Sequence, residues 1–275
     1  MSELALKGDL IGQGNTAEVF EWEDKGVLKL YRNGIPEIAC TNEFTITQYA
    51  YEHMKIAPKP IEIIHSNERI GAVYERLNGK TLLKMMVAKP WKLRKYSKML
   101  AQCHMKMHTK ASLSVRTVKE KLLDDIKRVS ILSLEEKRLI IAYVDTLSDG
   151  DCICHFDFHP DNVIIQNDQY YVIDWMTGCI GNPLSDVART VILLTYAKMP
   201  RAPFLVNAII KAMQKRICKY YLSEYKKLTN YNFSEMEKWK LPIAAARLSE
   251  WIPEGESRQL LDYVKQELSR MERKA

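Results

Sequence analysis

The sequence predicts an α+β protein of two lobes, a strand-rich N-terminal lobe (residues 1–77) and a larger, mainly helical C-terminal lobe (residues 78–275). Up to residue 77, short runs rich in Val, Ile and Tyr alternate with turn residues, which is the pattern of antiparallel strands. Beyond Pro90, apolar side chains recur at helical spacing over longer stretches. A chain of 275 residues with 47% hydrophobic composition is long enough to bury a core in each lobe.

The first predicted elements are a strand, a tight turn and a second strand over residues 10–20, with Gly12 and Gly14 in the turn. Glycine lets backbone amides approach a phosphate closely, although a hairpin turn with two glycines is common in other proteins. The next strand, residues 26–31, carries Lys29 in an apolar run. A buried ammonium group must be paired, so Lys29 is expected to reach a carboxylate or a phosphate unless it lies on an edge strand and points to solvent.

An amphipathic helix is predicted over residues 38–53, and it offers Lys29 a carboxylate partner. The candidates are Glu43 in its first turns, Glu37 at or before its start, and Glu52 near its end. Two more strands are predicted over residues 61–64 and 70–77, followed by a turn.

Helices are predicted from residue 90 to 143, from 187 to 197 and from 204 to 275, with a looser aromatic connector from Tyr225 to Trp239. His104 and His108 lie four residues apart, a spacing that can bind a metal. Met105 stands where the zinc protease signature has Glu, so both histidines are interpreted as structural.

The most informative stretch is residues 155–162, His-Phe-Asp-Phe-His-Pro-Asp-Asn, which leads into two apolar runs joined at Asn167 and ending before Asp174. The two runs predict a hairpin, and a hairpin brings Asp157 and Asn162 close to Asp174. Three converging oxygen-bearing side chains suit phosphoryl transfer from a nucleotide, in which one carboxylate orients the attacking hydroxyl and an Asn and an Asp hold magnesium. The alternative is an ordinary surface hairpin with polar ends.

These residues resemble the aminoglycoside phosphotransferase and choline kinase family of small-molecule kinases. The matching positions are His155, Asp157, His159, Pro160, Asn162, Asp174 and Trp175. Asp186, followed by Val and Ala, resembles the family's Asp-x-Ala segment that supports the catalytic loop. Phe156 departs from the pattern, because the family usually has Gly there.

The resemblance implies a bilobal protein-kinase-like fold with ATP held between the lobes, and it selects Glu43 as the partner of Lys29. The residues it implies for the nucleotide are Gly12 and Gly14 over the phosphates, Lys29 paired with Glu43 on the phosphates, and Glu75 and Leu77 at the adenine edge.

The resemblance also implies that Asn162 and Asp174 bind Mg2+, and that Asp157 orients the acceptor hydroxyl and accepts its proton late. His155 would buttress the loop and Asp186 would anchor it. The implied activity is transfer of the γ-phosphate of ATP to a hydroxyl of a small molecule, such as an aminoglycoside, choline or ethanolamine, a sugar, or homoserine. The candidates for the acceptor pocket are Trp239, Glu250, Trp251, Glu254 and Glu256, and the alternative is that they are ordinary surface and packing residues.

Three other functions fit parts of the pattern. A catalytically inactive kinase-fold binding protein is disfavoured because every chemistry-bearing residue is present. A protein kinase is disfavoured because Trp175 replaces the Phe of Asp-Phe-Gly and no Ala-Pro-Glu motif follows. A nucleic-acid-binding module rests only on the net charge of +7, which we attribute to a solvated surface. Neither a nucleic acid nor a membrane partner is therefore predicted, and the sequence leaves the oligomeric state open.

The remaining signals indicate a cytoplasmic protein. The first seven residues lack the basic region and apolar run of a signal peptide, and no apolar run is long enough to span a membrane. The six cysteines lack the paired spacing of a zinc site, so reduced thiols are expected.

Overall fold

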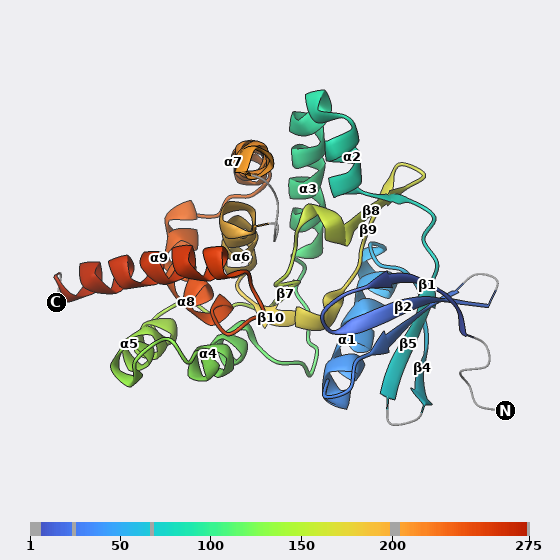
Figure 1. Ribbon diagram of the computed structural model, residues 1–275, viewed down its shortest axis with the longest axis horizontal. Helices are drawn as coiled ribbons and strands as arrows, with labels where there is room; N and C mark the ends of the chain where they lie inside the picture. Colours follow the sequence, from blue (N-terminus) through green and yellow to red (C-terminus); the bar gives the residue numbers. More distant parts are fainter. Residues whose placement is uncertain (1–6, 24–25, 67–68, 199–203, 274–275) are drawn as a thin grey trace. The chain divides into compact units, whose positions relative to one another are not determined.

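The computed structural model describes residues 7–23, 26–66, 69–198 and 204–273 of the chain (Figure 1). The chain divides into two compact units, one formed by Met1–Val87 with Pro160–Gly178 and the other by Ala88–His159 with Cys179–Ala275. This division differs from the predicted one at residue 77, because residues 78–87 and the later hairpin belong with the first unit. The reason is strand pairing, since β6 (Lys80–Thr81) is hydrogen-bonded to a strand of that hairpin.

An antiparallel sheet dominates the first unit. Its strands in the described residues are, in spatial order, β1 (Lys7–Gln13), β2 (Ala17–Trp22), β3 (Gly26–Tyr31), β5 (Arg69–Glu75) and β4 (Pro60–Ser66). Successive side chains of a strand point to opposite faces, so Ala72 joins a buried cluster with Cys40, whereas Val73 joins another with Trp22. The predicted strands of this region are confirmed.

The helix after β3 is α1 (Glu37–Tyr49), which continues into a π-helical turn, Ala50–Met54. The predicted helix is confirmed, but Glu37 lies inside it as its first residue. The buried positions of α1 recur every three or four residues and include Cys40, Glu43 and Ile46. This spacing turns one face of α1 toward the interior and carries Glu43 inward with the apolar side chains.

The predicted hairpin is confirmed, with β8 (Val163–Gln166) paired to β9 (Gln169–Val172) and the edge strand β6 on its other side. Asn167 and Asp168 form its turn with φ of 50° and 60°. A two-residue hairpin turn needs the left-handed region at both positions, and Asn and Asp tolerate it well. Just before β6, a Cβ on Gly79 would lie 2.3 Å from the carbonyl oxygen of Ile165, so the close strand approach requires glycine there.

Helices make up most of the second unit. They are α3 (Leu93–Met107), α4 (Val118–Arg128), α5 (Leu134–Asp145), α6 (Pro183–Tyr196), α7 (Phe204–Leu228), α8 (Phe233–Arg247) and α9 (Glu254–Glu272), and α2 (Leu82–Ala88) precedes them in the chain. A short pair, β7 (Cys152–Cys154) and β10 (Cys179–Gly181), leads into α6. Every residue from Pro183 to Leu194 is buried, and α6 contacts α7, α8 and α9. The predicted helical character is confirmed, and α6 forms the centre of this unit.

The aromatic connector predicted from Tyr225 to Trp239 is wrong. Helix α7 continues to Leu228 and α8 begins at Phe233, so four residues join them. Asn232 caps α8 by accepting a hydrogen bond from the amide of Ser234, and Tyr225 and Trp239 are buried. Tyr225 and Trp239, which bound the predicted connector, are therefore core residues of two helices.

The six cysteines are free thiols, and five of them are buried. Within the residues that the structure describes, none of the helices combines the length and the apolar character needed to cross a lipid bilayer.

Candidate functional site

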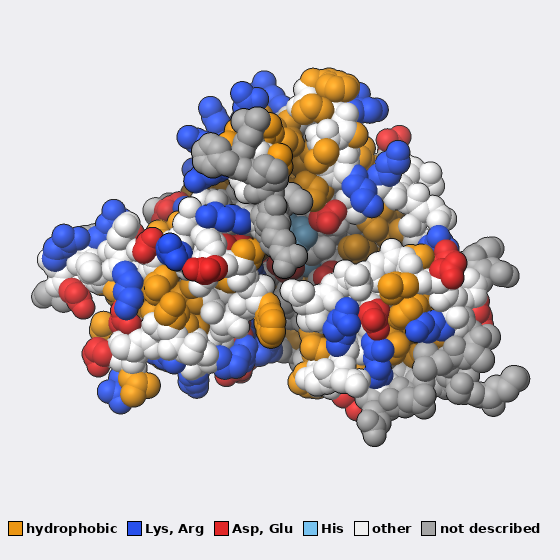
Figure 2. Space-filling view, viewed as in Figure 1, with side chains coloured by type: hydrophobic (Ala, Val, Ile, Leu, Met, Phe, Trp, Pro, Cys, Tyr) orange, Lys and Arg blue, Asp and Glu red, His pale blue; other side chains and the backbone are white. Residues whose placement is uncertain are grey.

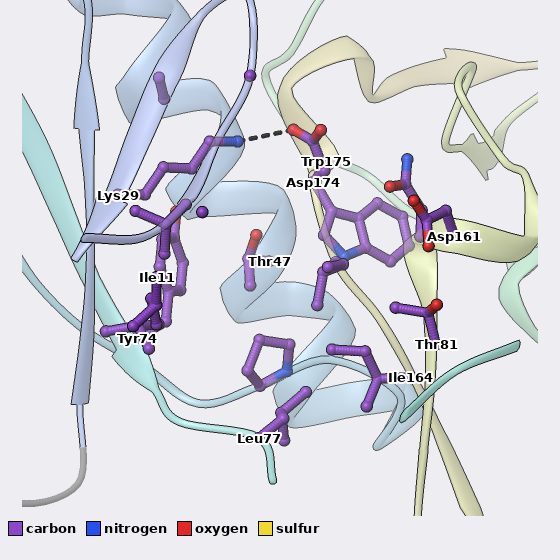
Figure 3. Close-up of a pocket in the computed structure, with 18 of the residues that line it drawn as sticks. Ile11, Lys29, Thr47, Tyr74, Leu77, Thr81, Asp161, Ile164, Asp174 and Trp175 are labelled. Carbon is purple, nitrogen blue, oxygen red and sulfur yellow. Dashed lines mark hydrogen bonds and ion pairs between the residues drawn. The ribbon is translucent and has the colours of Figure 1, made fainter. Parts of the chain in front are cut away.

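The first unit contains a cavity of about 510 Å3 (Figure 3). Its volume lies within the range of about 300–1,000 Å3 that is usual for small-molecule and cofactor sites. All residues predicted to hold nucleotide or metal line it: Gly12, Gly14, Lys29, Glu43, Glu75, Leu77, Asn162 and Asp174. Figure 3 shows Lys29 and Asp174 at one end of the cavity and Leu77 and Ile164 at the other. The cavity therefore has a charged end and an apolar end.

Lys29 connects the sheet, α1 and the end of the hairpin. Its ammonium group donates to both carboxylate oxygens of Glu43, at 2.7 and 2.9 Å, and to Oδ1 of Asp174 at 2.6 Å. Burial disfavours the charge on Lys29, but the two carboxylates outweigh burial and raise its pKa. A permanent positive charge therefore lies at this end of the cavity, where it is matched to a phosphate.

Glu43 is held from two sides. It receives the Lys29 ammonium and the hydroxyl of Tyr31, whose oxygen lies 2.5 Å from Oε2 of Glu43. Burial raises the pKa of Glu43, and the Lys29 ammonium opposes that effect. Glu37 and Glu52 do not line the cavity, so the structure selects Glu43 among the three candidates.

The hairpin positions two oxygen donors at its open end. The amide of Ile173 donates to the carbonyl of Asn162 at 3.0 Å, which ties the start of β8 to the end of β9. Asp174 adopts a left-handed conformation, with φ of 65°, and its side chain is 44% exposed. An amide oxygen and a carboxylate are hard ligands of the kind that Mg2+ prefers, so the donor set fits this ion.

Trp175 fixes the backbone beside Asp174. Its indole nitrogen donates to the carbonyl of Val172 at 3.0 Å, and its ring is buried. Because a strained left-handed residue persists only where its surroundings hold it, this hydrogen bond and the buried ring stabilise the conformation of Asp174.

The turn between β1 and β2 lines the cavity with backbone groups. The amide of Gly14 donates to the carbonyl of Ala17 at 2.8 Å. A Cβ on Gly12 would meet Val19 only at an ordinary distance of 3.7 Å, so the chain itself does not require glycine there. A ligand that approaches this backbone closely would explain the glycine.

Sequence reasoning did not select several other lining residues. They include Ile11, Thr47, Pro58, Tyr74, Thr81, Lys84, Asp161 and Ile164. Asp161 precedes Asn162 in the motif, and the alternation of the hairpin could have indicated Ile164. Lys84 lies on α2 with no sequence signal, because only the pairing of β6 with β8 brings this helix to the cavity.

In the second unit, α6 holds the loop that carries Asp157. The Asp186 carboxylate accepts hydrogen bonds from the backbone amides of His155, at 2.6 Å, and Phe156, at 2.9 Å. Thr190, one turn further along α6, donates to the carbonyl of Phe158 at 2.9 Å. The predicted anchoring contact of Asp186 is therefore present, and His155 is buried with its Nδ1 facing the amide of Asp157 at 3.2 Å.

Asp157 lies among positive and polar groups. Oδ2 is 3.7 Å from Nε2 of His159, and Oδ1 is 3.8 Å from the guanidinium group of Arg189. Burial would raise the pKa of Asp157, but His159, Arg189 and His155 together lower it below the usual range. The carboxylate is therefore ionised at neutral pH and suited to accept a hydrogen bond from a hydroxyl.

His104 on α3 and His108 directly after it contact the Asp186 carboxylate. Their Nε2 atoms lie 3.1 and 3.3 Å from Oδ2 of Asp186, and their Nδ1 atoms lie 2.5 Å from the hydroxyls of Tyr221 and Tyr225. Burial lowers the pKa of His104 to about 4, so this ring is neutral at pH 7. These polar groups connect α3 and α7 to Asp186, which holds the loop that carries Asp157.

Comparison with known protein families matches residues 7–215 to the phosphotransferase enzyme family. The chain belongs to this family. Among curated proteins, protein LicA of Haemophilus influenzae is 28% identical to this chain over 88 residues. That match covers 32% of the chain and spans about a third (33%) of LicA.

Solved structures show the same fold over nearly the whole chain. A thermostable mutant of aminoglycoside phosphotransferase APH(4)-Ia has a TM-score of 0.65 at 15% identity and covers 96% of this chain and 95% of its own. A choline/ethanolamine kinase family protein from Mesorhizobium loti has a TM-score of 0.61 at 12% identity, with coverage of 94% and 86%. The kinase-like fold and the family resemblance predicted from the motifs are confirmed.

The departure of this family member at Phe156 has an energetic consequence. Phe156 has φ of 63°, a left-handed conformation in which a side chain costs about 1–2 kcal/mol and glycine costs little. Its ring is nevertheless buried, with the ammonium of Lys121 5.9 Å from the ring centroid. Burial of the ring therefore offsets backbone strain that the family's usual glycine avoids.

Replacement of Phe156 by Gly is expected to lower the free energy of unfolding by about 2–4 kcal/mol, because the loss of a buried ring exceeds the strain relieved. Phe156→Ala serves as the control, since it loses the ring and keeps the strain, and it should be about 1 kcal/mol less stable than the Gly variant. Urea unfolding measures both values. A Gly variant as stable as the parent would contradict this balance.

Replacement of Lys29 by Met is expected to weaken nucleotide binding by about 10–100-fold, the usual loss for a hydrogen bond to a charged group. It also removes the cation that opposes the raised pKa of Glu43. A carboxyl whose pKa is raised on folding stabilises the protein at low pH and loses that contribution as the pH rises. The variant should therefore lose stability from pH 5 to pH 8 more steeply than the parent. Parallel stability curves would refute the pairing.

Proposed function

We propose that the protein is an ATP-dependent phosphotransferase that moves the γ-phosphate to a hydroxyl group of a small molecule. The observation that carries this proposal is the convergence of eight predicted residues on one cavity. The comparisons support it, because one similar structure, of APH(4)-Ia, is a complex with ADP and hygromycin B, and another, of the amicoumacin kinase hAmiN, contains AMP-PNP and Ca2+.

In this proposal the base occupies the apolar end of the cavity, beside Leu77 and Ile164, and the phosphates occupy the charged end. Backbone groups of Glu75 and Leu77 contact the adenine edge. Lys29, held by Glu43, neutralises the phosphates, and the turn with Gly12 covers them. The arrangement positions the transferred group, which is the main contribution a protein makes to phosphoryl transfer.

Asn162 and Asp174 would hold a magnesium ion, because their oxygen atoms suit it and both residues line the cavity. A bound Mg2+ supplies charge neutralisation on the phosphate oxygens as the transition state forms. Lys29 contacts Asp174 at 2.6 Å, so the side chain of Asp174 is already ordered toward the phosphate end.

Asp157 would orient the acceptor hydroxyl and accept its proton. Its lowered pKa makes it a weak base, and a weak base suits a loose transition state in which proton transfer is late. His155 packs under the loop and faces the amide of Asp157, which is a structural task. The implied acceptors are hydroxylated metabolites or antibiotics: aminoglycosides, choline or ethanolamine, sugars, or homoserine-like compounds.

Release of ADP in the presence of ATP and Mg2+ tests the proposal, measured with and without each acceptor class. Stimulation by one class above the rate without acceptor is expected, with a phosphorylated product visible by mass spectrometry. Nucleotide binding measured by calorimetry should occur without any acceptor. Failure to bind ATP would reject the proposal, whereas binding without transfer to any hydroxyl compound would favour a catalytically inactive binding protein.

A further inference from the structure

Arg189, a residue outside the recognised motifs, contacts the loop that carries Asp157. It is 3% exposed and lies on α6, three residues after Asp186 and therefore on the same side of that helix. Its Nε donates to the carbonyl of Phe156 at 3.0 Å. Asp186 holds the amide of Phe156 and Arg189 holds the carbonyl, so α6 fixes both sides of the residue before Asp157.

The guanidinium group of Arg189 also faces two carboxylates at unequal distances. It contacts Oε1 of Glu250 at 2.8 Å and Oε2 at 2.9 Å, whereas Oδ1 of Asp157 lies 3.8 Å away. The carboxylate groups raise the pKa of Arg189 against the effect of burial. Arg189 thus forms its close ion pair with Glu250 and a longer one with Asp157.

Glu250 is itself held in place from α8 and α9. Arg247 donates to Oε2 of Glu250 at 2.7 Å and to the buried Glu256 at 2.6 Å. Glu256 also accepts the amide of Lys198 at 3.3 Å. Charges alternate along this series from Asp157 to Glu256, so each buried charge has a partner of opposite sign. The series fixes the position of Glu250 and hence the direction of the Arg189 guanidinium.

We propose that Arg189 is a positioning residue for Asp157 and that Glu250 keeps it from pairing with Asp157 directly. At 3.8 Å from Oδ1 of Asp157, the guanidinium group of Arg189 favours the ionised carboxylate and leaves its oxygen atoms able to accept a hydrogen bond from the acceptor hydroxyl. An arginine bound directly would use the carboxylate oxygens that must accept the acceptor hydroxyl, because arginine and carboxylate groups form two parallel hydrogen bonds. This inference rests on the proposed function of Asp157.

The two partners should have opposite effects on Asp157. In Arg189→Gln the nearby cation is lost, so the pKa of Asp157 should rise by about 1 unit or more. In Glu250→Gln the arginine loses its closest anion and should turn to Asp157, so this pKa should not rise. Both variants should lower kcat by about 10-fold or more. Arg189→Gln loosens the loop that carries Asp157, and Glu250→Gln lets Arg189 bind the Asp157 carboxylate.

The double variant separates positioning from a general structural role. Once Arg189 is Gln, Glu250 no longer has an arginine to hold away from Asp157, so Arg189→Gln/Glu250→Gln should match the kcat of Arg189→Gln alone. Independent structural damage would instead multiply the two losses in kcat. Arg189→Lys keeps the charge and loses the planar fork, and it should keep the pKa of Asp157 low while lowering kcat. It also provides a test if the Gln variant does not fold.

The experiment measures kcat, the KM for ATP and the pKa of Asp157 by carbon NMR titration of its carboxyl group in all four variants. Glu235→Gln is the matched control. It removes an exposed ion pair with Lys238 on α8, and this pair has the i,i+3 spacing of Arg247 and Glu250. It should leave kcat and the pKa of Asp157 unchanged. The KM for ATP should change little in every variant, since Arg189 and Glu250 do not line the nucleotide cavity.

Multiplied losses in the double variant, or the same direction of pKa change in Arg189→Gln and Glu250→Gln, would overturn the inference. If the parent protein transfers no phosphate, the proposed function fails, and the NMR titration still decides whether Arg189 and Glu250 act on Asp157 in opposite directions.

Discussion

Asp157→Asn is expected to lower kcat by about 100- to 10,000-fold, the usual contribution of a positioned proton acceptor. Asn keeps the size of the side chain but cannot accept the proton of the acceptor hydroxyl. Nucleotide affinity should stay within about twofold, because Asp157 does not line the nucleotide cavity. Initial rates of ADP release and calorimetric titration with ATP measure the two quantities separately.

Asp168→Asn is the control for Asp157→Asn, since it makes the same chemical change in the exposed turn between β8 and β9, where Asn also tolerates the left-handed conformation. It should leave kcat unchanged. A kcat for Asp157→Asn above one tenth of the parent value, with the fold intact, would remove Asp157 from the proposed chemistry.

Asp174→Asn should lower kcat by about 100- to 1,000-fold, a loss typical of removing one preorganised charge-stabilising group. The rate should also lose its rise with Mg2+ concentration, because the carboxylate is the stronger of the two proposed ligands. In addition, Lys29 loses its ion pair with Asp174 and keeps the one with Glu43. Rates measured from micromolar to millimolar Mg2+ give both the size of the loss and the metal dependence.

Asn162→Asp distinguishes metal binding from general damage to the hairpin. It keeps an oxygen ligand and adds a charge, so the dependence on Mg2+ should persist, with a midpoint that is not weaker than that of the parent. If Asp174→Asn retains the magnesium response of the parent, the assignment of Asp174 as a metal ligand is wrong. If both variants unfold at the same lower temperature, the effect is structural.

Much of the nucleotide cavity could be predicted from the sequence because its residues are tied to local patterns. The apolar run 26–31 is the β3 strand, and the turn residues at 167–168 form the hairpin turn. Strand alternation and turn chemistry act over a few residues, so they remain visible in a sequence. Local composition misled at Tyr225 and Trp239. A stretch rich in aromatic residues can be a loop or the ends of two helices, and composition does not distinguish the two cases.

The sequence could not have revealed the environment of Asp157. Arg189 comes from α6 and Glu250 from the segment beyond the end of α8, and no spacing in the sequence connects these two residues. Asp186 was predicted from the resemblance, yet its contacts with His104 and His108 depend on how α3 packs in the second unit. Burial, which shifts the pKa values of these groups, exists only in the folded chain.

The sequence by itself determined the strands, the hairpin and the motif that names the family, because backbone geometry and short-range chemistry fix these features within a few residues. The tertiary structure brings Glu43, the glutamate that the resemblance selected, to Lys29 by turning one face of α1 inward. It also decided that Arg189 binds Glu250 more closely than Asp157. Such choices depend on distances between groups far apart in the chain, and only packing sets those distances.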